Sequence, residues 1–366
     1  KPRFGGSLLT SEATIGNQSG KEWANSIITE LKEMPNVIVK NRAQVFGYYD
    51  HNMLVMSERI NDHLPKSKKY SPKQRLWYIR AKEVVISSGS IERPLVFGNN
   101  DTPGVVLSSA AKEYLKVYGV LVGRNPLIFT NNDSAYETAI EFKKNGIWPI
   151  VLDTRSHPDS EIIDEAKRMG INIKFSYVVI AAKGYKKVKS AEIAKISEDK
   201  KDLGQIENIS CDCICVSGFW TPTIHLASQS GNKTKFNKEI DAFVPGHSKQ
   251  EETTVGSANG VFTLEETLKT SFEVGHELSK KITNNDNKVS VPQVTEKKST
   301  QHDKFWCVPL PKGKKYKRFL DFQNDVAVTD IELALREGYR SIEHVKRYTT
   351  LGMATDQGKT SNLNGL

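Results

Sequence analysis

The chain has 366 residues, of which 38% are hydrophobic and 26% are charged. This length is enough for two or three domains, and no apolar run approaches the roughly 18 residues of a membrane span, so the composition is that of a globular protein without membrane segments. The chain starts at Lys1 without a signal-peptide pattern, and we expect a cytoplasmic protein whose N-terminal part is missing.

The net charge of +9 is concentrated in three basic runs. Nucleic-acid binding would need these runs on one face with aromatic side chains between them, which a sequence does not show. We therefore predict a solvated surface and no nucleic-acid or membrane partner, with an acidic partner protein as the alternative. The runs are residues 66–75, 183–189 and 312–318.

The N-terminal part predicts a helix and then a small antiparallel sheet. Gly5, Gly6 and Ser7 lead into a helical pattern, in which apolar residues recur at helix spacing from Trp23 until Pro35 ends the helix. Strands are then predicted at residues 37–39, 44–49, 53–57 and 76–80, the last three forming a meander.

A buried strand at residues 84–86 is followed by small residues. Ser88 and Gly89 come directly after it, where small side chains let a ligand lie close to the end of the strand. The same pattern fits a strand that ends in a simple turn. The connection that follows this strand contains Pro94 and Pro103, which restrict its conformation.

Residues 125–156 have the length and pattern of half a dinucleotide-binding fold. A capping box of Ser134 and Glu137 starts the helix, and Gly146 ends it. Asp153 closes the second strand about 20 positions after the turn, where such folds place an acidic residue on the ribose. The predicted strands are 127–129 and 150–152, and the predicted helix is 134–145.

The turn of this unit contradicts a dinucleotide site. It lacks the glycines that allow close approach of a pyrophosphate, and the Asp133 carboxylate would repel a phosphate at the helix N-terminus. No other Gly-x-Gly-x-x-Gly occurs in the chain. We therefore predict a Rossmann shape that has lost its usual ligand. The turn residues are Thr130, Asn131, Asn132 and Asp133.

After a helix at residues 160–169, a second buried strand at residues 211–216 resembles the first one in design. Small residues and Pro222 follow it, so we predict that the chain leaves the first domain near Pro103 and re-enters it near Pro222. Cys211, Cys213 and Cys215 on this strand, like Cys307, lack metal-ligand spacing, and we predict four buried free thiols in a reducing compartment.

Small residues precede the next helix, predicted at residues 264–278 with Thr263 and Glu266 as its cap. Gly256, Ala258 and Asn259 form either an anion site at this helix N-terminus or a tight turn. Residues 282–301 have the composition of a linker. Two further helices are predicted at 330–338 and 341–348. No catalytic constellation is found, and we predict no catalytic residue and no metal site in this chain.

Four sequence blocks resemble the alpha subunits of heterotetrameric sarcosine oxidases. They follow the order of the family and extend through nearly the whole chain. The blocks are ERPLVFGNNDTPGVVLSSAAKEYLKVYGV, TNNDSAYETA, VSGFWTPTIHLASQSG and EHVKRYTTLGMATDQGKTSN. The resemblance places Lys1 after the first strand and glycine-rich turn of the subunit, and Leu366 before a folate-binding aminomethyltransferase domain.

The resemblance implies an α/β fold with two Rossmann-like dinucleotide-binding domains of the glutathione reductase type, one inserted in the other. A small α-rich domain, similar to a [2Fe-2S] domain without its cluster, follows them. The implied first domain comprises 1–102 and 217–281, the inserted domain 103–216, the linker 282–318 and the small helical domain 319–366.

The family also implies cofactors and partners. NAD is expected in this subunit, FMN at the interface with beta, and FAD and tetrahydrofolate elsewhere in a complex of alpha, beta, gamma and delta subunits that oxidises sarcosine. The alternatives are the alpha subunit of an imino-acid or opine dehydrogenase, or an interaction module without nucleotide. The residues expected to border the NAD are Gly5, Gly6, Ser7, Val45, Ser88, Gly89, Gly256, Ala258 and Asn259.

In related domains four cysteines hold an iron-sulfur cluster. The matching positions here carry no thiolate, so the resemblance implies no cluster. These positions are Asp321, Gln323, Asp356 and Ser361. The nearby turn is a candidate contact for FMN, with Lys359 facing its phosphate, although a lysine after a turn is also a common surface feature. The candidate contacts are Thr355, Gln357 and Lys359.

Overall fold

The computed structural model describes residues 3–65, 70–284, 286–287, 289–297 and 301–366. Residues 66–69 of the first basic run and several residues of the predicted linker lie outside these ranges. The chain forms two compact units, each made of two segments: residues 1–90 with 222–297, and residues 91–221 with 298–366. The finer four-part division predicted above stays a prediction.

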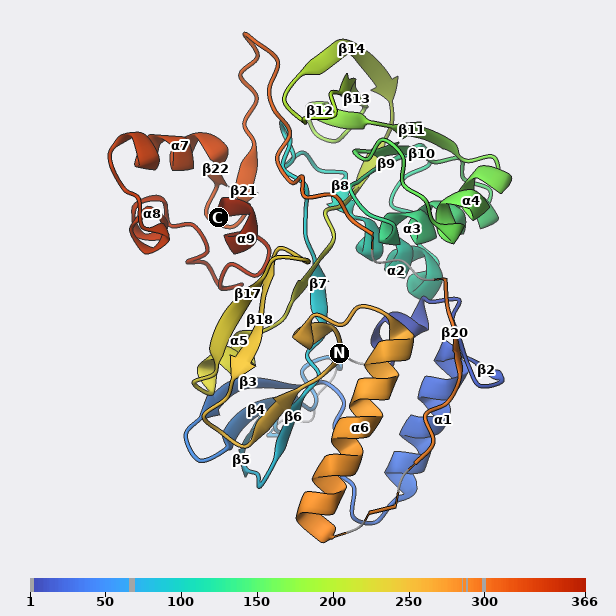
Figure 1. Ribbon diagram of the computed structural model, residues 1–366, viewed down its shortest axis with the longest axis vertical. Coiled ribbons are helices and arrows are strands. Elements are labelled where there is room, and N and C mark those ends of the chain that lie inside the picture. The colour runs from blue at the N-terminus through green and yellow to red at the C-terminus, as the bar shows by residue number, and fades with distance from the viewer. Residues whose placement is uncertain (1–2, 66–69, 285, 288, 298–300) are drawn as a thin grey trace. The chain divides into compact units, whose positions relative to one another are not determined.

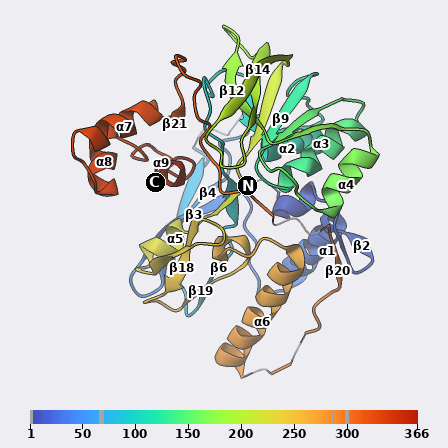
Figure 2. The ribbon, with the colours of Figure 1, turned by 45° about the horizontal axis from the view of Figure 1, so that its top comes forward.

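The second unit is built on a five-stranded parallel sheet in the order β11-β10-β9-β15-β8. Helices α2, α3 and α4 lie together beside this sheet (Figures 1 and 2). The elements are β8 (Val105–Leu107), α2 (Ser108–Tyr118), β9 (Pro126–Thr130), α3 (Ser134–Lys144), β10 (Ile150–Asp153), α4 (Glu161–Arg168), β11 (Asn172–Phe175) and β15 (Cys213–Ser217).

Alternation along these strands divides the core into two layers. Leu127 and Phe129 of β9 face one cluster, whereas Ile128 between them packs with the helices in another. Successive side chains of a strand point to opposite faces, and here both faces are buried, as is usual in parallel sheets. The predicted strand, helix and strand unit is therefore confirmed.

A three-stranded antiparallel sheet covers the other face of this core. Its strands are β12 (Tyr177–Lys183), β13 (Ser190–Ile196) and β14 (Leu203–Ser210). Val178, Val179 and Ile193 pack in the same cluster as Leu127 and Phe129.

The second unit also contains the C-terminal segment. Leu320, Val326 and Leu351 pack with Val96 of the earlier segment. The sequence predicts a small helical domain here, but the segment contains a short β-hairpin in addition to three helices. The elements are β21 (Phe319–Asp321), β22 (Val326–Ala327), α7 (Val328–Arg336), α8 (Ile342–Thr349) and α9 (Asn362–Gly365).

The first unit combines a predicted meander with a pair of parallel strands. The meander is confirmed as β3 (Ala43–Tyr49), β4 (Met53–Arg59) and β5 (Gln74–Arg80), and β6 (Val84–Ile86) pairs in parallel with β19 (Glu252–Thr254). The other elements are η1 (Gly6–Leu9), β1 (Thr14–Ile15), β2 (Gln18–Ser19), α1 (Gly20–Glu33), α5 (His225–Gln229), β17 (Lys233–Asn237), β18 (Ala242–His247), η2 (Gly256–Asn259), α6 (Leu264–Thr283) and β20 (Val294–Thr295).

The unit boundaries fall within two short strands that pair with each other, β7 (Ser90–Glu92) and β16 (Trp220–Pro222). The chain thus changes from one unit to the other at residues 90–91 and 221–222. The departure from a first domain near Pro103 and the return near Pro222 stay predictions.

Two local predictions are wrong. Residues 37–39, which follow α1, form no strand, because no other strand of the described residues pairs with them. The Thr263 side chain accepts no hydrogen bond at the start of α6, so the predicted cap is not formed. In addition, none of the described helices has the length and apolarity that a membrane span requires.

Candidate nucleotide-binding sites

The candidate site of the first unit lies where β6 and β19 end. These strands are parallel, so both carboxyl ends meet at one edge. Gly89 lies just beyond β6, and η2 follows β19. The Val255 N–H donates to the Ile86 carbonyl at 3.0 Å and extends the pairing to this edge. Ligands of open α/β sheets bind outside such strand ends.

The backbone at this edge leaves room for a ligand. Gly89 and Gly256 have φ values of 78° and 65°, a left-handed conformation that favours glycine. A Cβ added to Gly89 meets the Ser257 hydroxyl only at 3.9 Å, so the space beside this backbone is open. Ser88 donates its hydroxyl hydrogen to the Thr223 carbonyl at 2.7 Å and holds the turn in place. This geometry fits the close approach of a dinucleotide.

The remaining predicted NAD residues occupy different environments. Asn259 is exposed, whereas Ala258 is fully buried and would support the turn without touching a ligand. Val45 on β3 packs against the cluster that contains Ile86, the last residue of β6. Gly5, Gly6 and Ser7 lie at η1, a separate segment that packs on α1. The structure therefore unites residues 88–89 and 256–259 at one edge.

The second unit has the shape of a nucleotide site, but polar side chains occupy its turn. Asn131, Asn132 and Asp133 are almost fully buried between β9 and α3. Ser134 does not form the predicted capping box: it is the first residue of α3, and its N–H donates to Asn132 Oδ1 at 3.0 Å. Asn132 provides this cap because its side chain folds back over the turn.

A buried ion cluster lies at the same turn. The Arg155 guanidinium is 2.8 Å from Asp133 Oδ1 and 2.7 Å from Asp153 Oδ2. Burial raises the pKa of Asp133, and Arg155 opposes this rise. Asp153 also accepts the Tyr136 hydroxyl at 2.8 Å. Asp153 is therefore engaged within the protein and is not available to a ribose.

Residues 301–308, named here the strap, cover the turn. The Asp133 N–H at the start of α3 donates to the Gln301 carbonyl at 3.3 Å, and Arg155 Nη1 donates to the same oxygen at 3.2 Å. The Asn131 side chain donates to the carbonyls of Asp303 and Phe305 at 2.9 and 3.1 Å. Carbonyl oxygens of the chain thus take the place at the helix N-terminus where a phosphate would bind.

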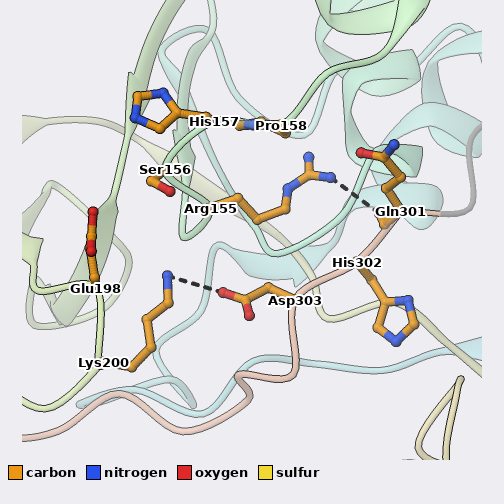
Figure 3. A pocket seen from close by; sticks show the side chains of 9 residues that line it. All are labelled: Arg155, Ser156, His157, Pro158, Glu198, Lys200, Gln301, His302 and Asp303. Atoms are coloured by element: carbon orange, nitrogen blue, oxygen red, sulfur yellow. Dashed lines mark hydrogen bonds and ion pairs between the residues drawn. The ribbon is translucent and has the colours of Figure 1, made fainter.

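The strap is held by side chains as well. The His302 ring stacks on Phe219 with centroids 3.9 Å apart, and Trp306 Nε1 donates to the Gly218 carbonyl at 2.8 Å. A hollow of about 750 Å³ lies beside the strap. Figure 3 shows that the Arg155 guanidinium is directed toward Gln301 and the Lys200 ammonium toward Asp303. These cations are already paired, so the hollow offers no free anion site through them.

The C-terminal segment brings together two of the four positions that hold a cluster in related domains, Asp321 and Ser361. Asp321 is 2% exposed and accepts the Gly352 N–H at 2.8 Å. The Ser361 hydroxyl lies 3.5 Å from the same carboxylate, and the Thr355 hydroxyl donates to Gln323 at 2.9 Å. Carboxylate, amide and hydroxyl groups do not fit an iron-sulfur cluster, which requires thiolates.

The candidate FMN turn is on the surface. Thr355 and Gln357 are exposed and Lys359 is half-buried. Gln357 has a φ of 57°, and its N–H donates to the Ala354 carbonyl at 3.0 Å, so the turn has a defined shape. The exposed side chains can meet a partner or ligand.

The cysteines do not form a metal site. Cys211, Cys213 and Cys215 are free and buried as predicted, but Cys307, which is also free, is exposed and not buried. Burial raises the pKa of Cys211 to about 12, so its thiol stays protonated near neutral pH. No group of three or more potential metal ligands occurs among the described residues.

Sequence reasoning missed Arg155 and the strap. Arg155 follows Asp153 by two residues at the end of a buried strand, and this spacing of opposite charges is a signal that could have been used. The strap has no such signal, because it begins in a polar segment with the composition of a linker.

The two units define a mixed α/β flavoprotein-type fold. L-proline dehydrogenase from P. horikoshii aligns with 100% of this chain and 66% of its own, with a TM-score of 0.68 and 19% identity. Thioredoxin reductase from T. acidophilum aligns with 71% of this chain and 81% of its own, with a TM-score of 0.52 and 14% identity. At these identities the likeness establishes the fold alone.

Comparison of sequences gives relatives at higher identity than the structural neighbours do. The sarcosine oxidase alpha subunit of Rhizobium meliloti (strain 1021) is 36% identical over 363 residues, which are 99% of this chain and 35% of that protein. Residues 315–366 match the family model of the sarcosine oxidase A3 domain. The chain is thus homologous, over nearly its whole length, to the alpha subunit of sarcosine oxidase. It spans 35% to 38% of the length of the curated relatives that it matches.

Proposed function

We propose that this chain is the NAD-binding scaffold part of a sarcosine oxidase alpha subunit. The observation that carries the proposal is the 36% identity over 99% of the chain. In the proposed complex, sarcosine is demethylated to glycine, electrons pass through FAD and FMN to oxygen to give hydrogen peroxide, and tetrahydrofolate accepts the one-carbon unit. This chain supplies no catalytic residue of its own and is inactive alone.

The edge formed by β6 and β19 is the proposed NAD site. Ser88 and Gly89 would hold the nucleotide beside the open backbone described above, with Gly256 at the start of η2 and Asn259 at the rim. Bound NAD supplies a nicotinamide ring that can exchange hydride, whereas the residues of this chain bind and orient it. The proposal also includes Gly5, Gly6, Ser7, Val45 and Ala258 as neighbours of the site.

Several properties belong to the whole complex. We propose beta, gamma and delta partner subunits, FMN at the interface with beta, and FAD and tetrahydrofolate elsewhere. The named relatives are subunits, which supports a multi-subunit assembly. The four free thiols support a reducing compartment, and we propose the cytoplasm.

A second candidate is the alpha subunit of an imino-acid or opine dehydrogenase. The whole-length likeness to L-proline dehydrogenase favours it at the level of fold. The residues at the four positions that carry cysteine in such domains argue against a dehydrogenase subunit, because none of them is a cysteine here. An amine-dependent peroxide assay of the full complex separates the two, since a dehydrogenase gives no peroxide from sarcosine and oxygen.

The NAD site is tested by nucleotide content. We expect the full-length protein, co-expressed with its beta partner, to release about one NAD per alpha chain on denaturation. Gly89→Ala is expected to reduce this content several-fold, because a Cβ strains the left-handed backbone and enters the space beside it. Chromatography of the released nucleotide measures the effect.

Gly119→Ala is the matched control. Gly119 has a φ of 65°, a Cβ there meets nothing within 4 Å, and the residue ends α2 in the other unit. It should be strained to a similar degree and leave NAD content unchanged. Equal loss in both variants, or no NAD in the unsubstituted protein, would contradict the proposal.

The FMN contact is tested at Lys359. Lys359→Ala in the complex is expected to lower FMN retention, because a cation that neutralises a phosphate is lost. Lys346→Ala is the control, since Lys346 is also half-buried and belongs to α8 of the same segment. Unchanged flavin content and turnover in the Lys359 variant would remove this residue from the site.

A further inference from the structure

Two basic runs that are far apart in the sequence converge on one surface of the second unit. Lys183 at the end of β12 donates to the Tyr316 hydroxyl at 2.8 Å and lies 3.0 Å from Glu192 Oε1. Lys314 lies 3.5 Å from the same Glu192 oxygen. The loop before β21 therefore runs beside the hairpin between β12 and β13, as the upper part of Figure 1 shows.

The two segments that meet here, residues 183–189 and 312–317, together contain eight lysines and are named here the lysine face. Glu192 is the carboxylate at its centre, and it contacts two of them. The other six are exposed and have no ion-pair partner in the described part of the chain. The face consists of Lys183, Lys186, Lys187, Lys189, Lys312, Lys314, Lys315 and Lys317.

Unpaired like charges at this density repel one another and oppose folding to a small extent. They also create a positive potential that reaches about 8 to 10 Å at physiological salt, and this attracts anionic partners and accelerates their association. Such a cluster adds nothing to the stability of the fold, and its charge is complementary to that of an acidic partner.

The side chains favour an acidic polypeptide over a nucleic acid. Arg318, the arginine beside the face, donates to the Val308 carbonyl at 3.0 Å and lies near Glu332, so it does not offer a free guanidinium fork. The Tyr316 ring is half-buried beneath Lys183 and Lys314, which leaves Tyr185 as the exposed ring of the hairpin. Nucleic-acid surfaces generally offer several stacking rings along a groove.

We propose that the lysine face binds an acidic segment of a partner subunit. This inference rests on the proposed function insofar as it assumes a multi-subunit complex. The face is expected to determine how strongly assembly depends on salt, because six of its lysines are exposed and without an ion-pair partner among the described residues.

The test uses the full-length protein assembled with its beta, gamma and delta partners. Lys186→Glu, Lys187→Glu and Lys315→Glu are combined, and mass photometry measures the assembled fraction at 50, 150 and 500 mM NaCl, concentrations on either side of the physiological ~0.15 M. We expect the apparent dissociation constant at the lowest salt to rise at least about tenfold, with a weaker salt dependence than in the unsubstituted complex.

The control carries the same charge change elsewhere. Lys195→Glu, Lys201→Glu and Lys269→Glu are at exposed positions outside both segments of the lysine face and should alter assembly less than about twofold. Equal effects in both triple variants, or unchanged assembly in the first, would overturn the proposal. So would a loss of single-stranded DNA binding in the first variant with assembly unchanged. NAD content is measured on the same samples, so that failure of the proposed function is recognised separately.

Discussion

Arg155→Leu is expected to lower the thermal unfolding midpoint of the second unit by about 10 °C. The substitution leaves Asp133 and Asp153 buried without their shared cation, and removing one partner of a buried ion pair costs about 3 to 5 kcal/mol. In a unit of this size each kcal/mol corresponds to roughly 2 to 4 °C. Circular dichroism of the purified protein measures the midpoint.

The loss should depend on pH. Burial raises the pKa of Asp133 above its usual value, and Arg155 holds the rise in check. Without Arg155 the pKa of Asp133 rises further, so the folded variant binds a proton more readily than its unfolded chain does. Stability is then regained as pH falls through this raised pKa. The gap between variant and unsubstituted protein should be smaller at pH ~5 than at pH ~8.

Two controls accompany this variant. Arg155→Lys keeps the charge but loses the planar fork, so an intermediate midpoint is expected. Arg168→Leu on the exposed side of α4 should change the midpoint by less than about 2 °C. If Arg155→Leu and Arg168→Leu gave the same midpoint at both pH values, the ion cluster would have no role in stability.

Asp321→Ala should loosen the C-terminal segment locally. Asp321 accepts the N–H groups of Gln323, Asn324 and Gly352 at 2.9, 3.2 and 2.8 Å. Removing the carboxylate leaves these donors without an acceptor, at about 1 to 3 kcal/mol for the buried one and less for the others. We expect amide exchange in residues 319–366 to accelerate roughly 100-fold, which corresponds to about 3 kcal/mol.

Mass spectrometry of exchanged peptides measures this opening. Asp321→Asn keeps one acceptor oxygen and should exchange at an intermediate rate. Asp325→Asn is the matched control, because Asp325 is exposed and asparagine also tolerates its φ of 53°. Exchange in Asp321→Ala that matched the Asp325→Asn control would show that the carboxylate does not hold the segment together.

Much of the fold was predictable because its cores follow simple periodicity. β9, β10 and β15 are short apolar runs buried on both faces, and Gly146 marks the end of the helix between β9 and β10. The strands at 127–129 and 150–152 and the helix at 134–145 were therefore predictable from the sequence pattern. The strand predicted at residues 37–39 from apolar alternation is wrong, because an alternating segment forms a strand only where a partner strand is available.

The second site shows where sequence reasoning ends. Asp133 predicts that a phosphate would be repelled, and the structure shows this carboxylate buried at the turn and paired with Arg155. The capping role assigned to Ser134 belongs to Asn132, because the buried turn lets the asparagine fold back. The strap lies about 170 residues further along the chain than the turn that it covers. Contacts between such distant segments produce no periodic pattern in the sequence, so they could not be predicted from it.

The parallel pairing of β6 with β19 also affects how the protein is made. The two strands are about 170 residues apart in the sequence. Because ribosomes add roughly 5 to 20 residues per second, β19 is synthesised about 10 to 30 seconds after β6. The parallel sheet of the second unit is complete in sequence by Ser217 and emerges during this interval. We therefore expect the nascent chain to form the sheet of the second unit first, while β6, the first strand of the candidate nucleotide-binding edge, is still unpaired and open to chaperones and to mispairing.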